Sequence, residues 1–351
     1  MAVQTVSGDI DKSMLGVTTA HEHVFIDLTN FFKPRRLKYN VDPYASVSIE
    51  NLGILSRDCY ALRDNLFYND FVVQKNEMLF FKNAGGMSVA DASCIGLGRD
   101  AARLKRMAAA TGLNILTGTG YYVASTHPAY INERSEHDIA AEMIREIREG
   151  INVDGIAQDE VICAGFIGEI GVSEVFNDAE RKVLRAAAYA SVETGASIHT
   201  HINPWTTFGL EAVRILLDNG AKPERVCIDH VDVELKTDYI NALLDMGVYI
   251  EFDNFGKEFY IDEQARSSGY GLFVHDTDRV KDLRRLIERG HVKQLLLSND
   301  ICLKNLLHRY GGWGYDHLLT NIVPMMKEFD ITVGSISKML IDNPAAFFDI
   351  P

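Results

Sequence analysis

The stretch VTTAHEHVFI, residues 17–26, combines apolar and β-branched residues with two histidines, His21 and His23, placed one residue apart. Short runs of this composition are typical of β-strands. Because side chains alternate between the two faces of a strand, both imidazoles point the same way, and Glu22 is expected to face the surrounding helices. The stretch therefore predicts a strand that presents a pair of nitrogen ligands on one face.

Seven further runs of this kind follow, each succeeded by a segment with helical spacing. The predicted strands lie at 17–26, 87–94, 114–122, 165–172, 197–202, 226–231, 248–254 and 294–299. The segments between them, such as DAERKVLRAAAYASVETG, place apolar residues three and four positions apart, and most end at a glycine suited to a helix C-cap. No G-x-G-x-x-G motif opens the first helix, which disfavours a doubly wound nucleotide-binding sheet. The pattern predicts one (β/α)8, or TIM, barrel domain over residues 1–351.

The segment 28–84 is the irregular part of this pattern. It is rich in aromatic residues and only partly helical in its spacing. We expect it either to cap the barrel or to form a contact between subunits.

Composition and charge narrow the functional classes. The chain of 351 residues is 47% hydrophobic and 24% charged, a typical globular composition, and is long enough for one barrel-type domain or two smaller domains. Its net charge of -14 would repel a phosphate backbone, so we expect no nucleic-acid partner. With neither a signal-peptide pattern nor an apolar run of membrane-span length, the expected location is the cytoplasm. The five scattered cysteines are expected to be reduced core residues.

In a barrel of this type the chemistry lies at the carboxyl ends of the strands. Side chains able to bind a metal at the predicted ends are His21, His23, Glu169, His199, His201, His230 and Asp300. A lone strand histidine is more often a hydrogen-bonded core residue, and Asp300 has the alternative role of a helix cap. Glu169 lies in the buried run GFIGEIGV, where an unpaired carboxylate costs several kcal/mol. Together these groups exceed what one ion needs, which predicts two ions, with Zn²⁺ favoured and Mn²⁺, Co²⁺ or Fe²⁺ as alternatives.

The runs HEH, GFIGEIG, HTH, CIDH, LLLSND and GGWGYDHLLTNIVP, in this order, resemble the phosphotriesterase-related branch of the amidohydrolase superfamily over essentially the whole chain. The resemblance implies a barrel with a binuclear metal centre, usually zinc, and commonly a homodimer. It implies that the more buried ion is bound by His21, His23 and Asp300. By the same resemblance His201 and His230 bind the more exposed ion, Glu169 bridges the two, and His199 is an outer or core residue.

The bridging residue sets this sequence apart from the phosphotriesterases proper, which carry a carbamylated lysine at the place of Glu169. The sequence resembles instead the glutamate-bridged branch, with the bacterial phosphotriesterase homology proteins and the mammalian phosphotriesterase-related protein. Family members with related sites hydrolyse lactones, carboxylic esters and N-acyl amides. The departure therefore lowers the expectation of organophosphate hydrolysis.

The predicted reaction is hydrolysis. A water shared by two divalent cations loses a proton near neutral pH, giving a bridging hydroxide, while a cation polarises the scissile carbonyl. Asp300 is expected to take the proton and pass it to the leaving group, through His230 or Asp232. The first expectation is a lactonase or carboxylic esterase on a small anionic substrate, the second an amidase on N-acyl amino acids, and the third a phosphotriesterase. A non-catalytic binding protein is disfavoured because it has no need of a buried, unpaired Glu169.

Substrate selection is expected from strand ends and loops. Tyr122 ends the third predicted strand and resembles a tyrosine that family lactonases direct at the metal-bound oxygen; a tyrosine at the barrel rim is the alternative. The loops after the seventh and eighth strands supply cations and flat apolar surfaces for an anionic substrate, and solvated surface side chains are the alternative. The residues chosen there are Lys257, Tyr260, Arg309 and Trp313.

Overall fold

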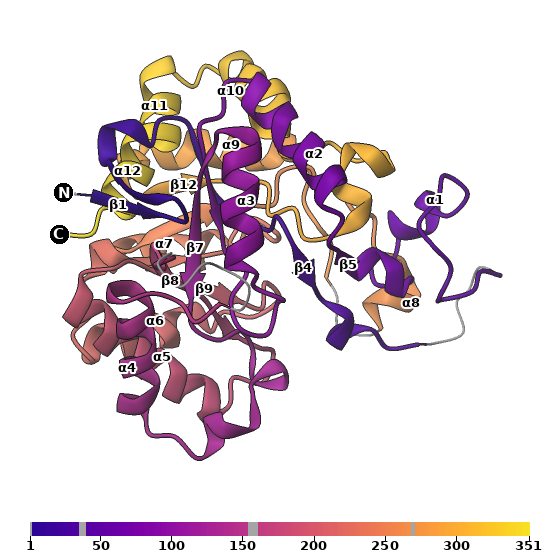
Figure 1. Ribbon diagram of the computed structural model, residues 1–351. Helices are drawn as coiled ribbons and strands as arrows, with labels where there is room; N and C mark the ends of the chain where they lie inside the picture. Colours follow the sequence, from indigo (N-terminus) through magenta and orange to yellow (C-terminus); the bar gives the residue numbers. More distant parts are fainter. Residues whose placement is uncertain (1, 35–39, 154–160, 268–270) are drawn as a thin grey trace.

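Eight parallel strands form the centre of the molecule in a computed structural model, which describes residues 2–34, 40–153, 161–267 and 271–351 (Figure 1). Each strand pairs with its neighbours along the chain. The strands are β3 (Thr18–Glu22), β6 (Ser88–Asp91), β7 (Asn114–Thr119), β8 (Phe166–Val172), β9 (Ile198–Ile202), β10 (Val226–Ile228), β11 (Tyr249–Phe252) and β12 (Leu295–Leu297). All eight lie inside the ranges predicted from the sequence.

Side chains join the first and last strands and so close the barrel. The backbone N–H of His21 donates to Ser298 Oγ at 3.1 Å, and the hydroxyls of Thr19 and Ser298 lie 2.7 Å apart. The prediction that Glu22 faces the helices is wrong, since its carboxylate is fully buried at this junction and accepts the backbone N–H of Asn299 at 3.0 Å. The physical reason is an irregularity in the β3–β6 register between Thr19 and Glu22, which breaks the simple alternation of side chains.

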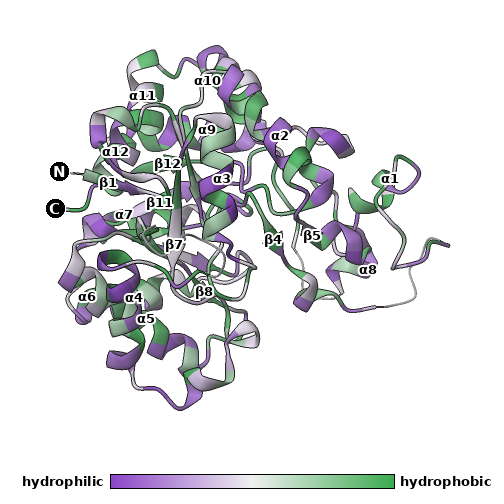
Figure 2. Ribbon diagram, in the orientation of Figure 1, coloured by the Kyte–Doolittle hydropathy of each residue, from purple (hydrophilic) through white to green (hydrophobic). Residues whose placement is uncertain are grey.

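Helices surround the barrel as crossovers between successive strands (Figure 1). In Figure 2 hydrophilic and hydrophobic residues alternate along these helices, as expected for helices with one buried face. The ring consists of α2 (Phe71–Asn83), α3 (Ala101–Thr111), α4 (Glu136–Arg148), α5 (Asp178–Thr194), α6 (Gly209–Asp218), α7 (Thr237–Asp245), α9 (Asp276–Glu288), α10 (Val323–Glu328), α11 (Val333–Ser337) and α12 (Asn343–Phe347). The predicted glycine caps are present at α3 and α5, where Gly112 and Gly195 adopt positive φ angles of 68° and 78°. Among the described helices, none has both the length and the apolar character needed to span a membrane.

The amino ends of the strands are sealed by an apolar cluster. The hairpin of β1 (Ala2–Thr5) and β2 (Gly8–Asp11) lies beside α12, and both chain ends lie on this side (Figure 1). Seven of the eight strands contribute a residue to the cluster, while β9 places His199 against it. Its members are Val3, Leu15, Ala20, Ala90, Leu116, Phe166, Cys227, Tyr249, Leu296, Phe347 and Phe348.

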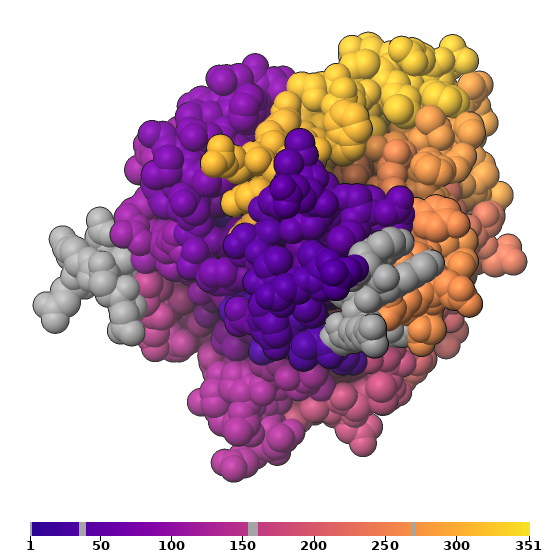
Figure 3. Space-filling view, turned by 90° about the vertical axis from the view of Figure 1, so that its right-hand side faces the viewer, coloured from indigo at the N-terminus to yellow at the C-terminus, as the bar shows by residue number. Residues whose placement is uncertain are grey.

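The segment 28–84 divides into two parts with different roles. Residues 71–83 form α2, which belongs to the ring. Before it, β4 (Ile26–Asp27) pairs with β5 (Phe67–Tyr68), and α1 (Leu52–Leu55) lies near α8 (Glu263–Arg266) (Figure 1). Figure 3 shows this indigo and violet part spread across one face of the molecule. Leu28, Phe31, Cys59 and Tyr60 line the cavity at the carboxyl ends of the strands, which agrees with the capping alternative.

Candidate metal centre and active site

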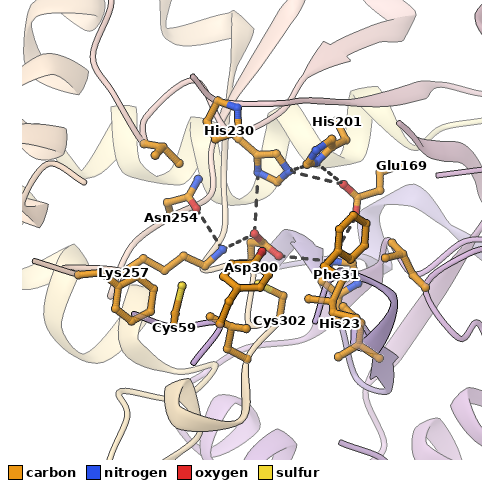
Figure 4. Close-up of a pocket in the computed structure, with 18 of the residues that line it drawn as sticks. His23, Phe31, Cys59, Glu169, His201, His230, Asn254, Lys257, Asp300 and Cys302 are labelled. Carbon is orange, nitrogen blue, oxygen red and sulfur yellow. Dashed lines mark hydrogen bonds and ion pairs between the residues drawn. The ribbon is translucent and has the colours of Figure 1, made fainter. Parts of the chain in front are cut away.

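Six of the predicted ligands meet at the carboxyl ends of the strands (Figure 4). They come from five places in the barrel: His21 in β3 with His23 directly after it, Glu169 from β8, His201 from β9, His230 after β10 and Asp300 after β12. His230 and Asp300 have positive φ angles of 60° and 45°, a backbone conformation that non-glycine residues rarely adopt. Such local strain is typical of residues placed by function.

The two oxygens of Glu169 face two different sets of side chains. Its Oε1 lies 3.3 Å from His23 Nε2 and 3.6 Å from His21 Nε2. Asp300 Oδ1 completes this set, 3.3 Å from His23 Nε2. Glu169 Oε2 instead lies 3.2 Å from His201 Nδ1 and 3.5 Å from His230 Nε2. The carboxylate therefore stands between a His–His–Asp set and a His–His set.

The separations of these ligand atoms are those expected for coordination of divalent cations, and several of the atoms form no hydrogen bond with one another. His21 Nε2, Glu169 Oε2 and Asp300 Oδ1 are buried without a hydrogen-bond partner. Two atoms bound to one tetrahedral ion at about 2.0–2.2 Å lie about 3.3–3.6 Å apart, which matches most of these separations. The ligand atoms of His21, His23 and Asp300 all lie within 4.8 Å of one another, as do those of His21, Glu169 and His230. Either group is compact enough to hold a cation, and the two groups share His21.

Opposite charges compensate for burial in this cluster. Burial opposes ionisation of Glu169, but the neighbouring imidazoles, His21 foremost, hold its pKa well below the usual range. Burial also lowers the pKa of His23, yet Asp300 and Glu169 outweigh it and raise that pKa to about 9. For Asp300, burial is outweighed by Lys257 and His23, so its pKa is also lowered. Both carboxylates are thus anionic at neutral pH, and uptake of a cation by His23 releases a proton.

Lys257 places a buried cation beside Asp300. Its side chain is 5% exposed, and its ammonium group contacts Asp300 Oδ2 and donates to Asn254 Oδ1 at 3.0 Å. Burial disfavours the charged ammonium, but Asp300 raises the pKa of Lys257 above its usual value. Asp300 thus turns one oxygen to Lys257 and the other to His23.

Glu22 ties the strand of His21 and His23 to the loop of Asp300. One oxygen of Glu22 accepts the backbone N–H of Asn299 at 3.0 Å, and the other accepts that of Ile301 at 2.8 Å. These two residues flank Asp300. The buried carboxylate therefore holds the strained Asp300 backbone in place from both sides.

A cavity of about 140 Å³ opens onto these residues, with different chemistry at its two ends (Figure 4). Lys257 and Asn254 form one end. Phe31 lies at the opposite end with its ring 6.0 Å from that of Tyr122. The lining residues that the sequence did not single out include Phe31, Cys59, Tyr60, Asn254, Phe259 and Cys302. Asn254 lies two residues after the end of β11, so the strand-end rule could have found it, whereas the irregular segment around Phe31 and Tyr60 carried no such signal.

The structure separates the predicted substrate residues into two groups. Tyr122 and Lys257 line the cavity, and the Tyr122 hydroxyl lies 3.3 Å from His201. Tyr260 and Trp313 are 70% and 54% exposed, and neither they nor Arg309 line the cavity.

Asp232 was a predicted proton carrier, and its carboxylate is already occupied. Arg279 Nε lies 3.1 Å from it, and Asn254 donates to it at 2.8 Å. His230, the other predicted carrier, has its Nδ1 3.8 Å from Asp300 Oδ2.

Comparison with known proteins places this site in a family. The phosphotriesterase family model matches residues 1–348. The chain belongs to this family. Phosphotriesterase-family members typically depend on a binuclear metal centre, and the buried His, Asp and Glu cluster fits that pattern. The chain is a hydrolase, as its named relatives are.

The relatives span nearly the whole chain. It is 34% identical to an N-acetyltaurine hydrolase of Mus musculus, over 97% of this chain and 96% of the relative. Among solved structures, a resiniferatoxin-binding protein from Rhodobacter sphaeroides has a TM-score of 0.91 at 30% identity, covering 99% of this chain and 95% of that one. The phosphotriesterase homology protein from Escherichia coli, complexed with phosphate in its active site, has a TM-score of 0.78 at 30% identity, covering 96% and 99%.

Proposed function

We propose that this phosphotriesterase-family hydrolase cleaves the amide bond of short N-acyl derivatives of small anionic amines. The observation that carries the proposal is the two-ended cavity. Lys257, a buried cation, lies at the Asp300 side of the ligand cluster, and the apolar Phe31 lies at the Glu169 and His23 side. A substrate that spans the cluster would place its anionic amine part near Lys257 and its short acyl part near Phe31. Relatives at this level of identity are named N-acetyltaurine hydrolases, and N-acetyltaurine has both of these parts.

The residues of the centre divide into two ligand sets. His21, His23 and Asp300 would hold the more buried ion, His201 and His230 the other, and Glu169 would bind both. Zn²⁺ suits these nitrogen and oxygen donors, which include no thiolate. Bound divalent cations supply an activated water and polarise the scissile carbonyl.

The chain's own residues then handle protons and orientation. Asp300, held anionic by Lys257, accepts the proton of the attacking water and delivers it to the leaving amine. Lys257 draws the anionic part of the substrate to the same end of the cavity, so the leaving nitrogen lies on the side of the Asp300 carboxylate. Tyr122 lies over His201 at the acyl side, and its hydroxyl donates a hydrogen bond to the carbonyl oxygen as charge develops there.

The names of the relatives support amides as the first candidate, ahead of the lactones and carboxylic esters that the sequence analysis placed first. Lactones and esters become the second candidate because the same attack opens their carbonyl group. Phosphotriesters remain third, since a bulky neutral triester fits poorly in about 140 Å³ beside a buried lysine.

A substrate matrix tests the proposal. Metal-loaded protein is assayed with N-acetyl, N-butanoyl and N-hexanoyl derivatives of taurine and of ethanolamine, with a lactone and with paraoxon. We expect the highest kcat/KM for N-acetyltaurine and at least about tenfold less for the neutral N-acetylethanolamine, a difference of about 1.4 kcal/mol. Faster turnover of the lactone or of paraoxon would overturn the proposal.

Two variants separate the ends of the cavity. Lys257→Met removes the cation at similar length, so the ratio of kcat/KM for anionic over neutral amides should fall about tenfold, even if both rates fall. Phe31→Ala is the matched change at the other end and should raise the relative rate on hexanoyl substrates without altering the charge ratio. A charge ratio that is unchanged in Lys257→Met would contradict the assigned orientation.

The setting that we propose is a cytoplasmic homodimer, supported by the family resemblance. On α2 the apolar side chains of Val72 and Phe80 are 66% and 48% exposed, as expected at a subunit contact. Sedimentation of the wild type and of Phe80→Glu tests this, because a monomeric wild type would contradict it.

A further inference from the structure

A second buried polar cluster lies inside the barrel, beside the six ligands and against the apolar seal of the amino ends. We call His199, Asp229 and Glu251 the interior cluster. Its side chains are fully buried, with His199 Nδ1 3.0 Å from Asp229 Oδ1 and 3.3 Å from Glu251 Oε2. The His199 ring packs against Phe347 and Phe348, with ring centroids 5.0 and 5.6 Å away. None of the three lines the active-site cavity, so none can touch a substrate there.

The interior cluster faces the ring nitrogen of His21 that the metal set does not use. His21 Nδ1 lies 3.5 Å from Asp229 Oδ2 and 3.7 Å from Glu251 Oε2. On the other side of the ring, His21 Nε2 faces Glu169. His21 Nδ1, Asp229 Oδ2 and both oxygens of Glu251 are buried without a hydrogen-bond partner. The imidazole is therefore placed between a ligand set and two carboxylates that need a proton donor.

We propose that the interior cluster is the outer shell of the more buried ion, and that Glu251 is its positioning residue. With its proton on Nδ1, His21 directs its N–H toward the carboxylates of Asp229 and Glu251 and presents the Nε2 lone pair to the cation. His199 holds the two carboxylates at the correct place. Partners of this kind fix the tautomer and orientation of a ligating histidine, and losing one typically weakens metal binding about 10- to 100-fold. This inference rests on the metal centre of the proposed function but not on its substrate.

A third cation is the competing explanation for the same atoms. His21, His199, Asp229 and Glu251 offer four ligand atoms within 4.8 Å of one another. However, a cation there would bind His21 through Nδ1 while Nε2 serves the first ion. The ring would then have to lose both of its N–H protons and become an anionic imidazolate, whereas a histidine that binds one cation stays neutral and keeps one N–H. The outer-shell role leaves one proton in place and pairs it.

The chain contains a matched control in Asp253. Its Oδ2 lies 3.0 Å from His230 Nδ1, and its carboxylate also accepts the backbone N–H of His230 at 3.1 and 3.2 Å. Asp253 thus backs an imidazole of the other ligand set. Glu251 and Asp253 lie two residues apart on and just after β11 and are both fully buried. Asp253 Oδ2 also lies 3.8 Å from His21 Nδ1, but its short contacts, at 3.0–3.2 Å, are with His230.

Stepwise metal binding tests the inference. Metal-depleted wild type, Glu251→Gln and Asp253→Asn are titrated with Zn²⁺ against a chromogenic chelator, and with Co²⁺ by visible absorption. We expect two equivalents in the wild type. Glu251→Gln should weaken one step about 10- to 100-fold and leave the other unchanged, while Asp253→Asn should weaken the other step. Glu251→Asp, which keeps the carboxylate, should recover part of the loss.

Ligand variants identify which ion is affected. The Co²⁺ spectrum that remains in Glu251→Gln at one equivalent should match that of His23→Ala, and the spectrum of Asp253→Asn should match that of His201→Ala. Equal weakening of both steps by Glu251→Gln would overturn the inference. A third equivalent in the wild type that Glu251→Gln removes would overturn it in favour of a third cation. A wild type that binds no metal would overturn both this inference and the metal centre, whereas two bound ions without amidase activity would overturn only the proposed substrate.

Discussion

The two ends of the barrel interior are both largely buried but chemically opposite. At the amino ends Phe166, Phe347 and Phe348 pack with their neighbours in a wholly apolar cluster. At the carboxyl ends Glu169 and Asp300 are 2% and 5% exposed and are surrounded by imidazoles and an ammonium group. Burial of apolar surface stabilises the first end, while burial of charge destabilises the second unless each group is paired or binds a cation. One barrel therefore divides stability and chemistry between its ends.

Metal removal should have the largest effect, because it should abolish the activity located at the carboxyl ends while the apolar amino ends keep the protein folded. Exhaustive chelation should abolish turnover, and adding back Zn²⁺ should restore it. Because a ligand at about 1,000 times its Kd stabilises by about 4 kcal/mol, the chelated protein should also melt at lower temperature. The apolar end should keep it folded, as far-ultraviolet circular dichroism would show. A chelated protein that is unfolded at 25 °C would refute the division.

A substitution that creates a cavity at the amino ends should have the opposite effect: it should lower stability and leave metal binding unchanged. Phe347 is fully buried, with its ring 5.1 Å from that of Tyr249 and 5.3 Å from that of Phe348. Phe347→Ala should therefore lower the free energy of unfolding by about 3–5 kcal/mol, measured in denaturant. Metal content at saturating Zn²⁺ should stay at the wild-type value. Phe347→Leu is the control and should cost clearly less, since it leaves a smaller void.

The ends also differ in how well the sequence predicts them. Periodicity located all eight strands, and the strand-end rule brought together distant residues such as His23 and Asp300, because parallel strands in a barrel share one carboxyl edge. Alternation failed at Glu22, where the register irregularity in β3 turns the side chain toward the last strand. No local pattern could place Phe31 or Tyr60 in the cavity, since their segment folds over the barrel through tertiary contacts. The exposed Trp313 shows that a loop's composition does not determine which side chains reach a cavity.

Glu22 tests the division between stability and chemistry more sharply, because it is a charged residue at the carboxyl ends whose role is to hold the backbone next to Asp300. Glu22→Gln keeps the size but replaces one acceptor with an amide, so the N–H of either Asn299 or Ile301 loses its partner. An unpaired buried group of this kind costs about 1–3 kcal/mol in the free energy of unfolding. The loosened loop should also weaken metal binding by the set that contains Asp300. Unchanged stability together with unchanged metal affinity would contradict the assigned role.

Tyr122 should give the smallest effect and tests whether the carboxyl end contains a purely catalytic group. Its hydroxyl lies 3.3 Å from His201, at the edge of the cavity. If the hydroxyl donates to the developing oxyanion, Tyr122→Phe removes one hydrogen bond of about 0.5–1.5 kcal/mol, so kcat should fall about 2- to 12-fold with little change in KM. The free energy of unfolding and the metal content should not change, because the ring and its packing on Phe31 remain. A kcat equal to that of the wild type would leave Tyr122 as a wall of the cavity. The catalytic part of the carboxyl end would then be confined to the ligand cluster and Lys257.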